Sequence, residues 1–144
     1  MWPLKSHRER QPALAAPHLL AILSDGSGRE AVTRFAEDRG WQLSVAGTVE
    51  EGHILFRPHA EIAIVLVDRD LAADDWRSTV RGLAERSPRP SVILASSVID
   101  PYLFDEVVKQ GGFDVLSKPI QADELRRTAL LAFKFRERRR RASG

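Results

Sequence analysis

The run Ile62-Ala63-Ile64-Val65-Leu66-Val67 is the most strand-like stretch of the chain, and it leads directly into Asp68. A short apolar run of this kind is typical of a strand that is buried on both faces, as in a parallel sheet. In such sheets, chemistry collects at the carboxyl ends of the strands. The run therefore predicts a central parallel strand, with Asp68 as a candidate functional residue at its end.

Four further stretches have strand-like patterns, and helical patterns separate all five strands from one another. The other strands are expected at residues 18–23, 41–46, 91–95 and 113–116. Helices are expected at 29–39, 48–58, 73–86, 100–111 and from about 123 onward. Strands that alternate with helices imply right-handed crossovers and a sheet that is covered on both faces. The expected fold class is therefore α/β, a doubly wound five-stranded parallel sheet with five helices.

Several helix ends carry recognisable signals. Thr48 is expected to cap a helix, and Glu51, three residues later, is expected to complete a capping box. Pro101 is expected at the first position of its helix, where proline is favoured. Gly40 and the pair Gly111-Gly112 follow helical patterns and are expected to end them.

The composition excludes several classes of protein. A chain of 144 residues suits one compact domain, and 43% apolar residues suffice for a core. The absence of cysteine excludes disulfides and thiolate metal sites, and the four histidines show no paired ligand spacing. No apolar run approaches the ~18 residues of a membrane-spanning helix, and the N-terminus lacks the apolar segment of a secretory signal. We expect a soluble, cytoplasmic protein.

Charge is unevenly distributed along the chain. The net charge is +2, but residues 134–141 hold six cations against Glu137 alone. The basic end is expected to be a solvated helix end that complements the helix dipole. Contact with nucleic acid or an anionic membrane is the less favoured interpretation. The expected division is a flexible N-terminal arm at 1–17, a folded domain at 18–133 and a basic tail at 134–144.

Polar side chains follow four of the five expected strands. Because parallel strands end at one edge of the sheet, these side chains are expected to converge. Two carboxylates with water can seat a hard cation such as Mg²⁺, and an aspartate can act as a nucleophile toward phosphorus. A lysine can neutralise the acyl phosphate that forms. The residues concerned are Ser24-Asp25 after the first strand, Asp68 after the third, Ser96-Ser97 after the fourth and Lys118 after the fifth.

With these residues in this order, the chain resembles the receiver domain of two-component response regulators over roughly residues 18–133. The resemblance implies the strand order 2-1-3-4-5, and a cis peptide bond at Lys118-Pro119. It also implies a phosphate acceptor that is assisted by a bound Mg²⁺ ion. The site residues that the resemblance assigns are the acceptor Asp68, the magnesium ligands Asp25, Asp68 and the backbone carbonyl of Asp70, and the phosphoryl-contacting Ser96 and Lys118.

The expected metal site departs from the family's pattern at one position. The family ends its first strand in an acidic pair, and Ser24 replaces one of those two acids. Because the number of charged ligands tunes affinity for such cations, weaker magnesium binding is expected. Asp70, Asp74 and Asp75 are the acids that could substitute, although Asp75 is expected to cap the helix that follows it.

The residues that relay phosphorylation in the family also differ. Val115 stands where the family usually has an aromatic residue that turns inward on phosphorylation. Phe113 is a candidate replacement, on the expectation that it lies on the same face of the strand. The loop after Asp68 has Trp76 where the family usually has glycine. The usual coupling between a hydroxyl and an aromatic ring therefore cannot operate in its ordinary form.

The first functional hypothesis is a stand-alone response-regulator receiver domain in phosphorelay signalling, not an enzyme beyond self-phosphorylation and autodephosphorylation. A sensor histidine kinase or phosphotransfer protein would phosphorylate Asp68. A downstream protein partner would bind the fourth helix, fifth strand and fifth helix, and a homodimer is left open. The alternatives are a receiver-like adaptor that never takes phosphate and a flavodoxin-like cofactor binder. Asp25 disfavours the latter, because its carboxylate would face the cofactor's phosphate.

Overall fold

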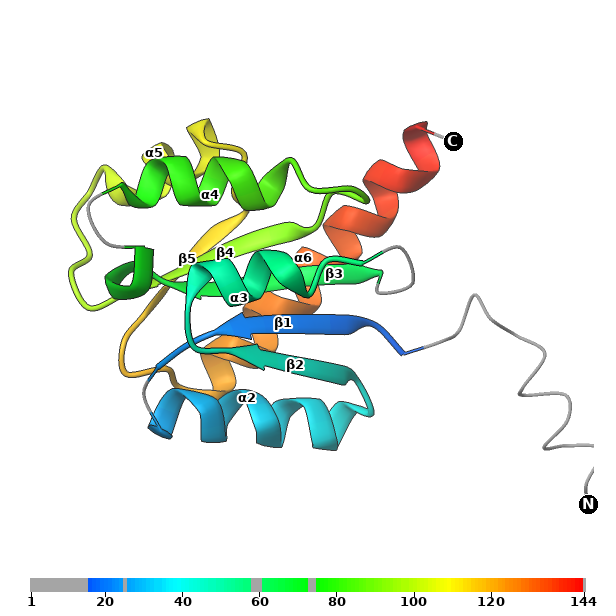
Figure 1. Ribbon diagram of the computed structural model, residues 1–144, viewed down its shortest axis with the longest axis horizontal. Coiled ribbons are helices and arrows are strands. Elements are labelled where there is room, and N and C mark those ends of the chain that lie inside the picture. The colour runs from blue at the N-terminus through cyan, green and yellow to red at the C-terminus, as the bar shows by residue number, and fades with distance from the viewer. Residues whose placement is uncertain (1–15, 25, 58–60, 73–74, 144) are drawn as a thin grey trace, which may run out of the picture.

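The computed structural model describes residues 16–24, 26–57, 61–72 and 75–143 and contains one five-stranded parallel sheet (Figure 1). The strands are β1 (His18–Ile22), β2 (Gln42–Ala46), β3 (Ile62–Asp68), β4 (Ser91–Ser96) and β5 (Asp114–Ser117). The helices are α2 (Gly26–Arg39), α3 (Val49–Ile54), α4 (Trp76–Ala84), α5 (Leu103–Lys109) and α6 (Ala122–Ser143), with a 3₁₀ turn, η2 (Arg69–Ala72). The strand order is β2-β1-β3-β4-β5. The predicted fold class and strand order are confirmed.

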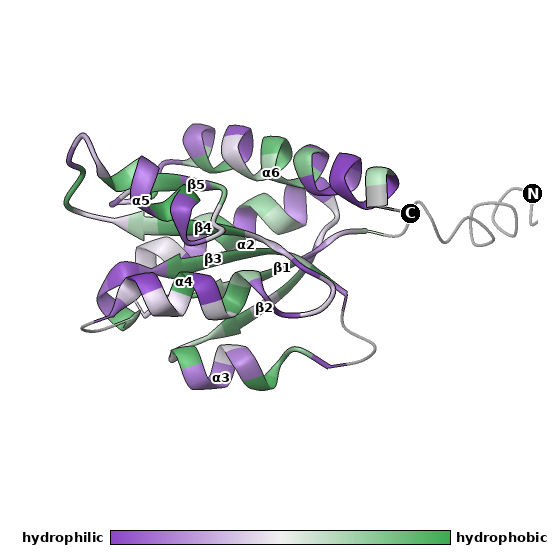
Figure 2. Ribbon diagram, turned by 90° about the horizontal axis from the view of Figure 1, so that it is seen from above, coloured by the Kyte–Doolittle hydropathy of each residue, from purple (hydrophilic) through white to green (hydrophobic). Residues whose placement is uncertain are grey.

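β3 is the centre of the sheet. It pairs with β1 on one side and with β4 on the other, and all seven of its residues are buried. One hydrophobic cluster packs α2 and α6 against the sheet, and a second packs α3, α4 and α5 against its other face. Figure 2 shows α6 on the opposite side of the sheet from α3 and α4. Burial on both faces explains why β3 is apolar at every position before Asp68, without alternation.

The cap of α3 differs in one detail from the predicted capping box. Thr48 Oγ1 accepts a hydrogen bond from the backbone N–H of Glu51 at 3.1 Å, as predicted. Glu51 Oε1, however, accepts from the N–H of Gly47 at 2.7 Å. The return bond therefore reaches the residue before the cap rather than the cap itself.

Three helices begin at residues other than those predicted. α4 begins at Trp76, three residues later than the predicted start at 73. α2 begins at Gly26, three residues earlier than its apolar pattern indicated. α5 begins at Leu103 rather than at Pro101, because Asp100 folds the intervening residues into a turn. The Asp100 Oδ1 atom accepts a hydrogen bond from the N–H of Tyr102 at 2.9 Å, and the Asp100 carbonyl accepts one from the N–H of Leu103 at 3.2 Å.

The basic segment near the C-terminus belongs to α6 and is not uniformly solvated. Arg136 is only 2% exposed, and its guanidinium donates to the carbonyls of Pro88 at 3.1 Å and Arg89 at 3.2 Å. Arg138, two residues later, is exposed. The expectation of a wholly solvated helix end is therefore wrong for Arg136, which anchors α6 to the loop before β4.

The outermost part of the expected N-terminal arm, residues 1–15, lies outside the described residues. None of the helices within the described ranges combines the length and the apolar character that crossing a membrane requires.

Gly112 occupies a position with little room for a side chain. A Cβ atom there would lie 2.5 Å from Val107 Cγ1 and 3.1 Å from the Val107 carbonyl oxygen. We expect Gly112→Ala to lower the free energy of unfolding by about 2 kcal/mol, as overpacking does, in urea denaturation. Gly26→Ala is the matched control, because its Cβ would have no heavy atom within 4 Å. Equal losses in the two variants would contradict the steric argument.

Candidate functional site

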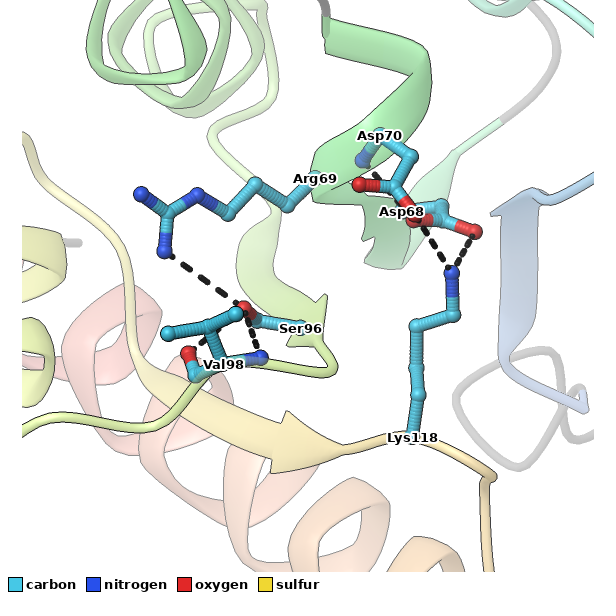
Figure 3. A network of polar contacts seen from close by, with 6 residues as sticks. All are labelled: Asp68, Arg69, Asp70, Ser96, Val98 and Lys118. Atoms are coloured by element: carbon cyan, nitrogen blue, oxygen red, sulfur yellow. Dashed lines mark hydrogen bonds and ion pairs between the residues drawn. The ribbon is translucent and has the colours of Figure 1, made fainter.

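Asp68, Ser96 and Lys118 come together at the carboxyl edge of the sheet (Figure 3). Asp68 is the last residue of β3, and its side chain is 1% exposed. Lys118 follows β5 directly, and its Nζ donates to Asp68 Oδ2 at 2.8 Å. The sheet therefore brings a buried carboxylate and an ammonium from two distant segments into contact, as the strand-end argument predicted.

The backbone holds Lys118 in place beside β4. Its N–H donates to the carbonyl of Ser96 at 3.0 Å, which continues the pairing of β5 with β4 by one residue. The Lys118-Pro119 peptide bond is cis, as predicted. The Lys118 side chain is 19% exposed, so its ammonium approaches Asp68 from the rim of the site.

Asp70 completes a cluster of two carboxylates around one ammonium. Its N–H donates to Asp68 Oδ1 at 2.9 Å, and its own Oδ2 accepts from Lys118 Nζ at 3.1 Å. Burial alone would lower the pKa of Lys118, but the hydrogen bonds and charges of the two carboxylates outweigh it. The pKa of Lys118 is therefore raised above its ordinary value of 10.5.

The hydroxyl of Ser96 is engaged in a local turn. Ser96 is buried, and its Oγ donates to the carbonyl of Val98 at 2.7 Å and accepts from the N–H of the same residue at 3.1 Å. Arg69 Nη1 also donates to this oxygen, at 3.5 Å. Ser96 therefore lies at the predicted edge, with its hydroxyl directed along its own loop.

Arg69 is a residue of this site that the sequence analysis missed. It follows Asp68 in η2, and its guanidinium lies over the ring of Trp76, with Cζ 5.4 Å from the ring centroid. Trp76 is 4% exposed and carries a second guanidinium, that of Arg77, at 4.7 Å. The signal in the sequence was a basic residue directly after the candidate acceptor, in a loop with tryptophan in place of glycine.

Two of the acidic residues expected to bind a metal ion lie outside the described residues. They are the expected ligand Asp25 and the candidate substitute Asp74. Asp75 caps α4, as predicted, by accepting from the N–H of Ser78 at 3.1 Å. Among the residues that the structure describes, no three acidic or histidine side chains are placed to hold a metal ion. Asp68 and Asp70 nevertheless fit Mg²⁺, because their carboxylates already converge on one cation.

The expected replacement for the family's aromatic switch residue is wrong. Val115 is half-buried and packs with the cluster under α3, α4 and α5, whereas Phe113 packs with the cluster under α2 and α6. The ring of Phe113 lies 5.3 Å from that of Phe135 in α6. Phe113 precedes the first residue of β5, so the alternation of a strand does not extend to it.

A search of curated proteins finds a relative that is itself a regulatory protein. The chain is 30% identical over 114 residues to the photosynthetic apparatus regulatory protein RegA of Rhodobacter capsulatus. The match covers 79% of this chain and 61% of RegA, so this chain spans less than two thirds of that relative's length. No family model matches the chain.

Solved receiver domains superpose on nearly the whole described fold. A response regulator from Thermotoga maritima has a TM-score of 0.72 at 23% identity, over 83% of this chain and 98% of its own. The signal receiver domain of a putative Luxo repressor protein from Vibrio parahaemolyticus has a TM-score of 0.75 at 20% identity, over 90% and 98%. A CheY-like receiver domain protein from Methanospirillum hungatei has a TM-score of 0.74 at 14% identity, over 87% and 99%. The fold of this chain is therefore that of a response-regulator receiver domain.

Proposed function

We propose that this chain is a receiver domain of phosphorelay signal transduction that accepts a phosphoryl group on Asp68. The observation that carries the proposal is the buried Asp68 carboxylate at the end of β3, held by the Lys118 ammonium at 2.8 Å. The fold and the similarity to RegA support a signalling role.

The proposed reaction is a phosphoryl transfer from a phosphohistidine. A carboxylate oxygen of Asp68 attacks phosphorus, an O–P bond forms, and the P–N bond breaks with its electron pair going to the histidine nitrogen. Lys118 then donates to a phosphoryl oxygen and offsets part of the added negative charge. Ser96 exchanges its hydrogen bond to Val98 for one to the phosphoryl group.

Asp68 and Asp70, with Asp25, which follows β1 in the sequence, are the residues that would hold Mg²⁺. The ion would supply additional positive charge next to the transferring phosphoryl group. Asp70 supplies a carboxylate in addition to its carbonyl, and this carboxylate compensates for the acid that Ser24 lacks.

The proposed upstream partner is a sensor histidine kinase or a phosphotransfer protein. The proposed downstream partner is a protein that binds the surface formed by α5, β5 and α6. Large apolar side chains are exposed on this surface, which suits contact with a partner or a second copy. They are Tyr102, Phe104 and Val108 around α5 and Leu131 and Phe135 on α6.

Incubation with phosphoramidate and Mg²⁺, followed by intact mass measurement, tests the proposal. We expect one phosphoryl adduct in the native protein and none in Asp68→Asn. The matched control is Asp114→Asn, which removes a carboxylate from β5 and keeps Asp68 and its contacts with Lys118 and Asp70. No adduct in the native protein at millimolar Mg²⁺, or an adduct that survives in Asp68→Asn, would exclude Asp68 as the acceptor.

A second candidate function is a receiver-like adaptor that works without phosphate. The local turn of Ser96 and the aliphatic Val115 favour it, because neither residue forms the usual relay. Hydrogen exchange of the native protein with and without beryllofluoride separates the two functions. Changed protection in α5, β5 and α6 supports the phosphorylation switch, and unchanged protection despite bound beryllofluoride supports the adaptor.

A further inference from the structure

Arg69 places a second cation at the rim of the site, next to the turn at Ser96. In Figure 3 its side chain extends from η2 toward the turn at Ser96 and Val98, away from Lys118. Its Nη1 lies 3.5 Å from Ser96 Oγ, a long and weak hydrogen bond. Within the described part of the chain, no carboxylate forms an ion pair with Arg69.

The charges around Asp68 indicate what the Arg69 guanidinium could contribute when Asp68 carries a phosphoryl group. Lys118 is shared between the carboxylates of Asp68 and Asp70. An acyl phosphate on Asp68 carries roughly 1.5 to 2 negative charges in place of the single charge of the carboxylate, and Lys118 is the one ammonium that the two carboxylates already share. The guanidinium of Arg69, next to Ser96, is a second protein cation that can neutralise part of this charge.

Trp76 holds Arg69 near the site without neutralising it. The ring lies within the distance of a cation–π contact, which attracts a guanidinium and leaves its N–H donors available. Arg77 shares the same ring, but its Nε forms an ion pair with Glu106 at 3.0 Å. The two arginines are therefore a natural comparison, since they share the ring contact and only Arg77 has a carboxylate partner among the described residues.

We propose that Arg69 is a phosphoryl-binding residue of this site, seated on Trp76 and donating to phosphoryl oxygens when Asp68 is modified. The inference rests on the proposed function of Asp68. A guanidinium presents paired N–H donors that match two phosphoryl oxygens. Ser96, the present acceptor of Arg69, turns toward the same group. Lys118 and Arg69 then hold the phosphoryl group from two sides.

Titration with beryllofluoride at saturating Mg²⁺, followed by fluorine NMR, tests the inference in the full chain. We expect Arg69→Gln to weaken beryllofluoride binding roughly tenfold, as the loss of a hydrogen bond to a charged group does. Arg69→Lys should restore part of the affinity, because it keeps the charge without the fork. Arg77→Gln, the matched control, should bind as the native protein does.

A separate titration with Mg²⁺ alone distinguishes a direct contact from an effect through the metal. Arg69→Gln removes a positive charge, so its Mg²⁺ affinity should be equal to or greater than that of the native protein. Native-like beryllofluoride affinity in Arg69→Gln, or an equal loss in Arg77→Gln, would overturn the role of Arg69. If the native protein binds no beryllofluoride, the proposed function of Asp68 fails as well, and the inference falls with it.

Discussion

Replacement of Lys118 by methionine is expected to lower the free energy of unfolding by about 3 kcal/mol at neutral pH, the low end for breaking a buried ion pair. Among the described residues, the substitution leaves the buried Asp68 carboxylate with the N–H of Asp70 as its one hydrogen-bond donor. An uncompensated buried charge is costly because it has lost its water. Urea denaturation monitored by circular dichroism gives the value.

A double-mutant cycle assigns this loss to the charge of Asp68. In an Asp68→Asn background no charge remains to be stranded, so Lys118→Met should cost less than about 1 kcal/mol there. An equal cost in both backgrounds would mean that the Lys118 side chain stabilises the fold through packing alone.

Alkaline pH provides an independent check of the same pair. The pKa of Lys118 is raised in the folded protein, because pairing with Asp68 and Asp70 outweighs its burial. The stabilisation from this pairing is therefore fully present below the ordinary value of 10.5 and is lost as pH rises through the folded value. The difference in unfolding free energy between the native protein and Lys118→Met should stay constant to about pH 9 and narrow above 10.5.

Replacement of Arg136 by alanine is expected to lower the free energy of unfolding by about 2 kcal/mol, since hydrogen bonds from a charged donor are lost. The substitution leaves the carbonyl of Pro88 without its donor and removes one of two donors from Arg89, which also accepts from Arg139 at 3.3 Å. It also opens a void where the buried side chain packs. Thermal and urea unfolding measure the effect.

Arg138→Ala is the control for Arg136→Ala, because it removes the same type of residue from an exposed position two residues away. Its expected change is within about 0.5 kcal/mol. The loss of unfolding free energy in Arg136→Lys should fall between those of the two alanine variants. An ammonium keeps the charge but cannot donate to both carbonyls as the guanidinium does. Comparable effects at 136 and 138 would indicate that only the net charge of α6 matters.

The sequence predicted the features that depend on continuous runs of apolar residues, namely the strands and the residues at their ends. β3 and the contact between Asp68 and Lys118 could be predicted because the carboxyl ends of parallel strands meet at one edge. The direction of the Ser96 hydroxyl could not be predicted, since the turn to Val98 decides it. Strand alternation was extended one residue too far at Phe113.

The basic residues show the same limit. A count of cations does not distinguish Arg136, whose side chain is buried against two carbonyls, from the exposed Arg138. It also does not show that Arg69 turns toward Ser96 rather than into solvent. The roles of the site residues stay predictions, and Asp25 lies outside the described ranges. The division of the chain into an N-terminal arm, a folded domain and a basic tail, at residues 17 and 133, also stays a prediction.

The course of α6 determines where a label can be attached. The helix starts just after Lys118, at the edge of the sheet that holds Asp68, and Arg136 ties its later turns to the loop that precedes β4 (Figure 1). Its 22 residues span about 33 Å at the usual rise per residue. A fluorophore or a biosensor tether attached near the end of α6 would therefore lie at the end of the molecule opposite to the Asp68 site. A label at this end would lie away from the edge of the sheet that holds Asp68 and Lys118.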